Sequence, residues 1–92
     1  MISQKLLEEA KKLIGGDRQN DYGDKLKNHQ NIADLWSVFL KTKITAHDVA
    51  ICMALVKIAR LMNQHKKDNY IDLAAYGAIA GEINERITKE KK

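Results

Sequence analysis

The 92-residue sequence contains no proline and only one cysteine, and both shortages limit what the chain can form. A proline-free chain rich in Ala, Leu, Ile, Lys and Glu favours helices over the turn-rich architecture of β-proteins. Cys52 lies in an apolar run and has no second cysteine with which to form an intramolecular disulfide. We expect this thiol to be buried and unreactive. The single cysteine and the lack of a recognisable signal peptide also suggest a protein of the reducing cytoplasm.

Long hydrophobic runs and metal-binding or catalytic motifs are also missing. The longest apolar stretch covers residues 49–56 and ends at Lys57, whereas a membrane-spanning helix needs about 20 apolar residues. The sequence has no His/Cys/Glu cluster with metal-ligand spacing, no P-loop, no GxSxG element and no dinucleotide-binding fingerprint. We therefore expect no membrane insertion, no cofactor and no metal.

The length and charge of the chain suggest one domain, self-association and an anionic partner. A domain of this size buries only about 60–65% of its unfolded surface, so a lone monomer would be marginally stable and a homo-oligomer is expected. The net charge is +4. We expect residues 1–92 to form this single domain. Several cationic residues lie near the C-terminus, where we expect a frayed basic tail from about residue 87.

Apolar periodicity predicts an all-α fold, a compact single-domain bundle of about four helices. The expected helices cover residues 4–14, 25–41, 45–65 and 68–89. Ser3 is a possible cap for the first, with Ile2 packed on Leu7. Thr45 and Asp48 match a capping box at the start of the third, which is apolar almost all round and is therefore expected to be the central, buried helix.

The middle of the fourth helix is rich in small residues. Glycine inside a helix costs roughly 1 kcal/mol relative to alanine, so its presence indicates that a backbone or a ligand comes close. Close helix packing, within or between subunits, is the preferred interpretation. These residues are Ala74, Ala75, Gly77, Ala78, Ala80 and Gly81.

Lys57 and Arg60 are cations on an otherwise apolar helix, about 60° apart around its axis. Charges in apolar surroundings are costly unless they are paired or hydrated. One interpretation is an internal ion-pair network with Asp72 of the fourth helix. The other is an anion-binding patch in which the planar Arg60 guanidinium binds phosphate.

Asp72 and Tyr76 are one helical turn apart and share a face, where they could complete a mixed polar pocket. Tyr76 could stack on a base, and Asp72 could accept from a ribose hydroxyl or orient Arg60. Tyr76 could equally be a tyrosine at the edge of the core with a hydrated hydroxyl.

The polar, glycine-rich segment 15–23 precedes the second helix and is the longest candidate loop. Arg18 in this loop and the first-turn amides of the following helix suit an anion. Asn28 and His29 lie just after it, although a lone histidine is more often a surface residue than a catalyst. The candidate ligand-binding residues are Arg18, Asp21, Tyr22, Gly23, Asn28, His29, Lys57, Arg60, Asp72 and Tyr76.

Two elements make residues 18–80 resemble a family of small phage and prophage helical proteins of unassigned function. The first is Asp21-Tyr22-Gly23, and the second runs from Lys57-x-x-Arg60 to Asp72-Leu73-Ala74-x-Tyr76. The second element also looks like the helical domain associated with phage nucleotide modification. More distantly, it resembles MazG-type nucleoside triphosphate pyrophosphohydrolases.

The resemblance to MazG-type enzymes implies Mg²⁺ held by two pairs of carboxylates on facing helices, and this sequence departs from that pattern. The third helix has only Asp48, at its cap. Asp68 and Asp72 could form one half-site, but opposing carboxylates are missing. Two-metal phosphoryl chemistry needs several carboxylates that converge on one point, so we expect binding rather than hydrolysis.

The leading hypothesis is therefore a phage-type protein, located in the cytoplasm of a bacterial host, that sequesters a small phosphorylated nucleotide. Small phage-encoded oligomers include anti-defence sponges for host immune signals such as cyclic ADP-ribose derivatives and cyclic oligonucleotides; the analogy is one of size, charge and phage character. The alternatives are a MazG-like pyrophosphohydrolase or nucleotide-modification enzyme, and a small DNA- or protein-binding module. Specific nucleic-acid binding is disfavoured because no helix has several Arg, Lys and Asn side chains on one face.

Overall fold

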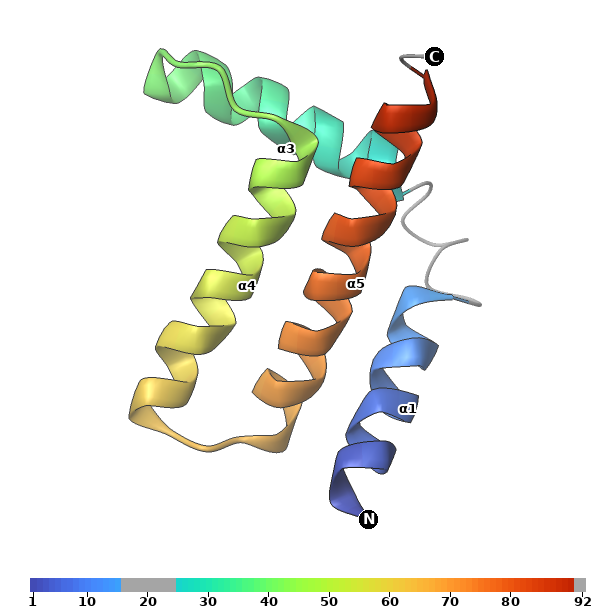
Figure 1. Cartoon of the computed structure of the whole chain (residues 1–92). Helices are drawn as coiled ribbons and strands as arrows, with labels where there is room; N and C mark the ends of the chain where they lie inside the picture. The colour runs from blue at the N-terminus through green and yellow to red at the C-terminus, as the bar shows by residue number, and fades with distance from the viewer. Residues whose placement is uncertain (16–24, 91–92) are drawn as a thin grey trace.

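The computed structural model describes residues 1–15 and 25–90, with the backbone alone described at Glu90, the last residue of α5 (Lys67–Glu90). The other helices are α1 (Ile2–Ile14), α3 (Lys25–Leu40) and α4 (Ala46–Asn63), and the described residues contain no strand. This architecture confirms the all-α, four-helix prediction (Figure 1).

The helices are arranged around α5, which lies between α4 and α1 (Figure 1). A short turn joins α4 to α5, so these two helices run antiparallel as a hairpin. Helix α3 crosses one end of this hairpin and extends beyond α4 (Figure 1). As a result, the chain brings α1 and α4 to opposite sides of α5 rather than to each other.

The core consists largely of small side chains, which lets the helices approach closely. At the end crossed by α3, Ala46 and Ala50 of α4 pack against α5. The α5 residues in this cluster are Ile79, Ala80 and Ile83. At the other end, Ala10 of α1 packs against Ile71 and Ala75 of α5.

The prediction that α4 is the central, buried helix is wrong. Only Ala46, Val49 and Ala50 are buried on α4, whereas five of its larger apolar residues are 40–86% exposed: Ile51, Leu55, Val56, Ile58 and Met62. The physical reason is that α4 packs mainly on α5 and on α3, so its remaining face has no neighbour within the described chain. For the same reason Cys52 is exposed, contrary to the buried thiol expected from the sequence.

Helix ends agree with the sequence in one case and differ in others. The Thr45–Asp48 capping box is confirmed, with the Asp48 amide 3.1 Å from Thr45 Oγ1 and the Thr45 amide 2.9 Å from Asp48 Oδ2. The first helix instead begins at Ile2, which places the expected cap Ser3 inside it. Ile2 and Leu7 are both exposed, so they do not form the expected packing contact.

The C-terminal helix α5 remains helical to Glu90, beyond the point near residue 87 where a frayed tail was expected. Two ion pairs one turn apart, Arg86–Glu82 at 3.2 Å and Lys89–Glu85 at 3.0 Å, contribute to these last turns. Farther back on α5, a Cβ added to Gly77 or Gly81 would meet no described atom within 4 Å. Close packing within the described chain therefore involves Ala75 and Ala80 of the strip but not these two glycines, where packing between subunits stays a prediction.

The capping box of α4 makes the stability of the protein decrease as the pH falls into the acidic range. The hydrogen bond from the Thr45 backbone amide lowers the pKa of Asp48 below its ordinary value of 3.8. A carboxylate with a lowered pKa stabilises the fold above its unfolded-state pKa and loses this contribution as the pH falls through its folded-state pKa.

We therefore expect Asp48→Ala to destabilise the protein near neutral pH and to differ less from the unsubstituted protein at about pH 2.5. Thr45→Ala should cost about 1 kcal/mol of the free energy of unfolding, as is typical of a lost cap. Urea unfolding at both pH values measures these differences. A destabilisation by Asp48→Ala that is equal at both pH values would contradict the ionic contribution.

Candidate functional site

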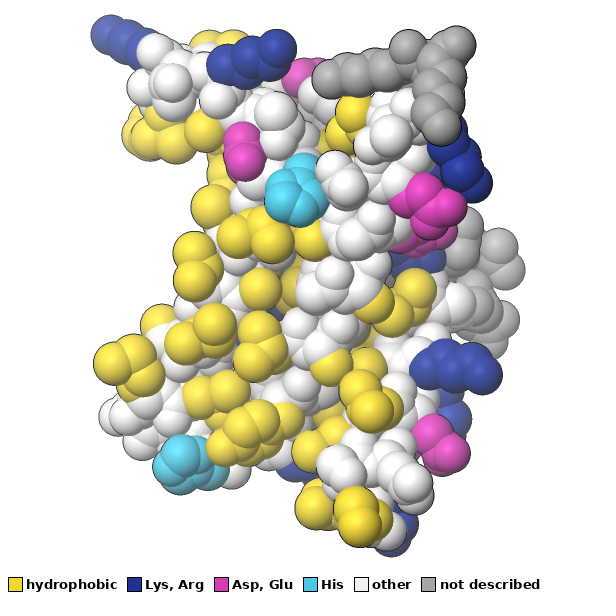
Figure 2. All heavy atoms as spheres, viewed as in Figure 1, with side chains coloured by type: hydrophobic (Ala, Val, Ile, Leu, Met, Phe, Trp, Pro, Cys, Tyr) yellow, Lys and Arg dark blue, Asp and Glu magenta, His cyan; other side chains and the backbone are white. Residues whose placement is uncertain are grey.

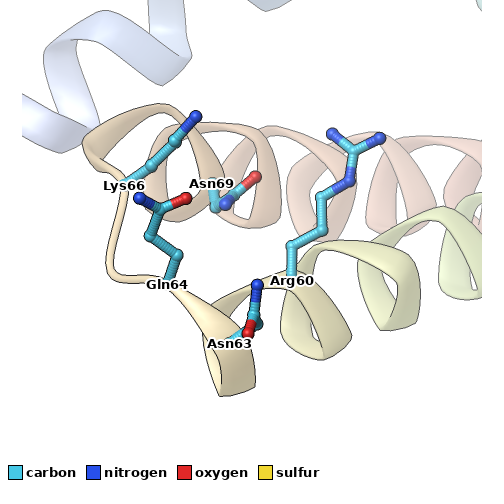
Figure 3. Close-up of a pocket in the computed structure, with 5 residues that line it drawn as sticks. All are labelled: Arg60, Asn63, Gln64, Lys66 and Asn69. Carbon is cyan, nitrogen blue, oxygen red and sulfur yellow. The ribbon is translucent and has the colours of Figure 1, made fainter.

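A small hollow of about 240 Å³ lies where the turn between α4 and α5 meets the facing sides of these helices. Its lining consists of two cations and three amides, without a carboxylate. The lining residues are Arg60, Asn63, Gln64, Lys66 and Asn69. Figure 3 shows Arg60 on α4 reaching toward α5, and Asn69 on α5 between Arg60 and the turn residues Gln64 and Lys66. Such a set of donors is suited to an anion.

Asn69 is the most unusual member of this set. It is only 7% exposed, and no other described residue forms a hydrogen bond with its side-chain amide. No fully buried side-chain nitrogen or oxygen among the described residues lacks a hydrogen-bond partner, so the amide of Asn69, which has none, keeps contact with solvent. Since the amide borders the hollow, a ligand or water there would supply the missing partner.

The two cations of the hollow are also available to a ligand. Neither Arg60 nor Lys66 forms an ion pair with an acidic side chain among the described residues. A guanidinium donates two parallel hydrogen bonds to a phosphate, and an ammonium adds a point charge beside it. The geometry therefore allows Arg60, Lys66 and Asn69 to donate to one anion.

Local hydrogen bonds shape the turn that forms one wall of the hollow. The Gln64 amide donates to the Arg60 carbonyl at 3.0 Å and ends α4. The Lys66 amide then donates to Gln64 at 3.0 Å, and the Asn69 amide donates to Lys66 at 3.1 Å. His65 and Tyr70 approach to 2.9 Å between Nδ1 and the phenol oxygen, which links the turn to the first turns of α5. These contacts hold the side chains of the hollow on a short, ordered segment.

Lys57 and Arg60, grouped together by the sequence, have different surroundings. Lys57 Nζ lies 3.0 Å from Asp72 Oδ2, with the two side chains 12% and 29% exposed. This is the ion pair of the first interpretation, so Asp72 is engaged with Lys57 and does not orient Arg60. Arg60 alone of these three lines the hollow, as the second interpretation requires.

Tyr76 and His29 lie in the contact between α3 and α5, away from the lining of the hollow. Tyr76 packs against the core cluster of Ile79 and Ile83, and its ring meets the His29 ring edge to face at 6.4 Å. Contrary to the surface position expected for a lone histidine, His29 is buried, because α5 covers it. Asn28, the neighbouring candidate, is exposed on α3.

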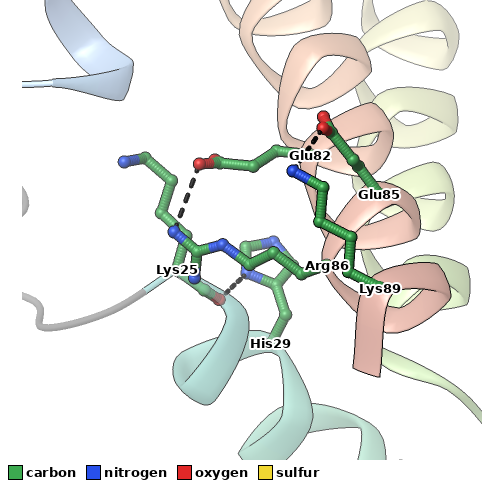
Figure 4. A network of polar contacts seen from close by, with 6 residues as sticks. All are labelled: Lys25, His29, Glu82, Glu85, Arg86 and Lys89. Carbon is green, nitrogen blue, oxygen red and sulfur yellow. Dashed lines mark hydrogen bonds and ion pairs between the residues drawn. The ribbon is translucent and has the colours of Figure 1, made fainter. Parts of the chain in front are cut away.

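His29 also belongs to a polar region between the start of α3 and the end of α5 (Figure 4). Its Nδ1 lies 2.8 Å from the Lys25 carbonyl oxygen. The pairs Arg86–Glu82 and Lys89–Glu85 lie beside it on α5. Arg86 and Lys89 have carboxylate partners, which makes this region less suited to an added anion than the hollow.

Four remaining candidates, Arg18, Asp21, Tyr22 and Gly23, lie outside the described residues. Sequence reasoning in turn missed Asn63, Lys66 and Asn69. The polar run from Asn63 to Lys66 was interpreted only as the end of a helix. Its position between two helices that pack together was the available indication that it could border a pocket.

Two properties of the described residues concern other kinds of site. No group of three or more His, Cys, Asp or Glu side chains in residues 1–15 and 25–90 is close enough to hold a metal ion. Within the same residues, every helix is too short or too polar to cross a membrane.

Comparison with known proteins places the chain in a family. Residues 5–84, which include the whole hollow, match the model of DUF6378, a domain of unknown function. The chain belongs to the DUF6378 family.

Curated relatives of this DUF6378 protein come from mycobacteriophages. The chain is 41% identical over 76 residues to the Gene 55 protein of Mycobacterium phage L5, covering 80% of this chain and 49% of the relative. It is 39% identical over 85 residues to the Gene 55 protein of Mycobacterium phage D29, covering 91% of this chain and 56% of the relative. The predicted resemblance to phage proteins of unassigned function is thus confirmed, and the chain spans about half the length of these relatives. No solved structure matches the chain significantly.

Proposed function

We propose that this protein binds and sequesters a small phosphorylated ligand of the nucleotide class, with a phosphate group held in the hollow between α4 and α5. The observation that supports the proposal most is the side-chain amide of Asn69, which has no partner among the described residues and borders the hollow beside the unpaired cations Arg60 and Lys66. An amide donor next to two cations favours an anion over a neutral ligand, because the anion accepts a charge-assisted hydrogen bond from each of them.

The size of the hollow limits how much of the ligand it holds. Its volume of about 240 Å³ is below the roughly 300–1,000 Å³ of typical small-molecule pockets. A phosphate group fits inside, while the sugar and base of a nucleotide extend along the surface. Several phosphorylated nucleotides then share the same anchoring contact, and the similarity to phage proteins supports host immune nucleotides as the class to test first.

The test is a binding panel followed by substitution of the hollow. Isothermal titration would compare inorganic phosphate, nucleoside triphosphates, cyclic dinucleotides, cyclic ADP-ribose isomers and a short DNA duplex. For the tightest ligand, Arg60→Gln should cost about 1.5–3 kcal/mol, which corresponds to roughly 10- to 150-fold in Kd. Asn69→Ala should weaken the same ligand, whereas Lys27→Gln, which removes an exposed charge on α3, should change the Kd less than about twofold.

Sequestration and catalysis are distinguished by the fate of the ligand. A sequestering protein binds in the presence of EDTA, and denaturing the complex returns the nucleotide unchanged. Steady Mg²⁺-dependent release of pyrophosphate or a monophosphate, lost on Asp72→Asn, would support the pyrophosphohydrolase alternative. Binding of the DNA duplex alone would support the DNA-binding alternative, and equal affinities of Arg60→Gln and Lys27→Gln would remove the hollow as the binding site.

A further inference from the structure

One flank of the molecule exposes large apolar side chains from two helices, and we call this surface the apolar notch. On α4 the exposed residues recur at intervals of four, three and four, which places them in one stripe. Figure 2 shows hydrophobic side chains on the projecting part of α3 and along α4, on either side of a concave stretch of the molecular outline. The notch consists of Leu35, Val38 and Phe39 of α3, and Ile51, Leu55, Ile58 and Met62 of α4.

The notch is too large for the surface of a typical monomer. Its side chains are 40–86% exposed, and together they present on the order of 700 Å² of apolar surface. Monomeric proteins rarely expose more than roughly 300–600 Å² in one patch. A stable protein–protein interface buries about 800 Å² per partner, so the notch has the area that one partner requires.

The α3 side of the notch is held away from α4 by an ordered corner. Ser37 Oγ accepts from the Ile44 amide at 2.8 Å and lies 2.7 Å from the Ala33 carbonyl, to which it donates. Lys41 follows with φ of 57°, the left-handed conformation that reverses the chain after α3. Because these contacts fix the corner, α3 does not fold back to cover α4, and the notch stays open within one chain.

The α4 stripe has the spacing that helices use to pack on one another. Intervals of four, three and four residues between Ile51, Leu55, Ile58 and Met62 match the a and d positions of a helix–helix seam. The charge nearest this stripe in sequence, Lys57, is turned inward to Asp72. The stripe can therefore be buried against another helix without burying an unpaired charge.

We propose that two copies of this chain associate through the apolar notch as a two-fold symmetric dimer. An L-shaped surface made of a projecting helix and an apolar stripe is self-complementary: the α3 arm of one copy covers the α4 stripe of the other, and the reverse contact forms by symmetry. Each copy thereby supplies the neighbour that α4 of the other copy lacks. This dimer is independent of the proposed ligand, because the residues that line the hollow are not part of the notch.

Sedimentation velocity of the 92-residue chain tests the dimer. We expect a dimer at about 10 µM, and we expect Leu55→Glu and Phe39→Glu each to raise the dimer dissociation constant at least 30-fold, as central apolar contacts do. Leu7→Glu on α1 is the matched control, because Leu7 is as exposed as Leu55 but lies outside the notch. It should leave the dissociation constant unchanged.

Methionine oxidation gives a second measurement that needs no substitution. Met62 in the notch and Met1 outside it are 86% and 87% exposed in one chain, so they would oxidise at similar rates in a monomer. In the dimer, Met62 should react with peroxide at least fivefold more slowly than Met1, and dilution should remove this difference. A monomer at ~100 µM, equal oxidation of the two methionines, or dissociation by Leu7→Glu alone would each overturn the proposal.

Discussion

Ile83→Ala lowers the free energy of unfolding by about 3–4 kcal/mol, close to the upper part of the range for large-to-small substitutions in a core. Ile83 is 1% exposed and belongs to the cluster in which α5 packs against Ala46 and Ala50 of α4. Its α4 neighbours in this cluster are alanines, whose short side chains cannot move in to fill the space left by the removed atoms. The loss thus includes both transfer and cavity contributions.

Thermal and urea unfolding at a fixed protein concentration measure this change, since dimerisation makes stability depend on concentration. For a chain of this length, 3–4 kcal/mol corresponds to a decrease in Tm of roughly 12–25 °C. Leu7→Ala removes the same number of carbon atoms from an exposed position on α1 and should cost less than about 1 kcal/mol. A cost for Ile83→Ala no greater than that of Leu7→Ala would show that the core lies elsewhere.

Asp72→Asn is the second large effect, with an expected cost of about 2–3 kcal/mol. The substitution leaves Lys57, whose side chain is 12% exposed and whose Nζ lies 3.0 Å from Asp72 Oδ2 in the native protein, without a compensating charge. Removal of one partner from a fully buried pair costs about 3–5 kcal/mol. The partial exposure of Asp72 reduces the expected value because water reaches its carboxylate.

Two further variants separate the ion pair from a general effect of charge. Glu9→Gln neutralises the carboxylate of the exposed Lys12–Glu9 pair on α1 and should cost less than about 0.5 kcal/mol. The double variant Lys57→Met with Asp72→Leu should recover stability to within about 1 kcal/mol of the unsubstituted protein, because a buried pair is often replaceable by apolar groups. Equal costs for Asp72→Asn and Glu9→Gln would mean that the Lys57–Asp72 pair stabilises the protein no more than an exposed ion pair does.

The sequence predicted the number and class of the helices because these depend on local periodicity and on caps such as Thr45 and Asp48. It did not predict which helix is central. An apolar run in α4 looks the same whether its own chain or a second chain covers it, so residues such as Leu55 and Cys52 were expected to be buried. The central position of α5 follows from small residues on two of its faces, Ala75 toward α1 and Ala80 toward α4.

The candidate site was predicted in part, and the difference lies in the alignment of α4 with α5. The sequence singled out Arg60 as a cation with unusual surroundings, and Arg60 lines the hollow, where its binding role stays a prediction. Periodicity placed Lys57 on nearly the same face, but only the pairing of the two helices decides that Lys57 meets Asp72. The same alignment brings Asn69 opposite Arg60, and no pattern in the sequence indicates this relation.

The path of the chain gives its parts unequal resistance to local opening. The α4–α5 hairpin forms through contacts between residues close in sequence, whereas α1 meets α5 only after more than half of the chain has been ordered. Ala10 is the only buried residue of α1, and Leu6, Leu13 and Ile14 are only partly buried, so separating this helix from α5 exposes less apolar surface than separating α4 from α5. We therefore expect α1 to open more readily than the α4–α5 hairpin and to fold after it, so that the hollow stays intact when α1 separates.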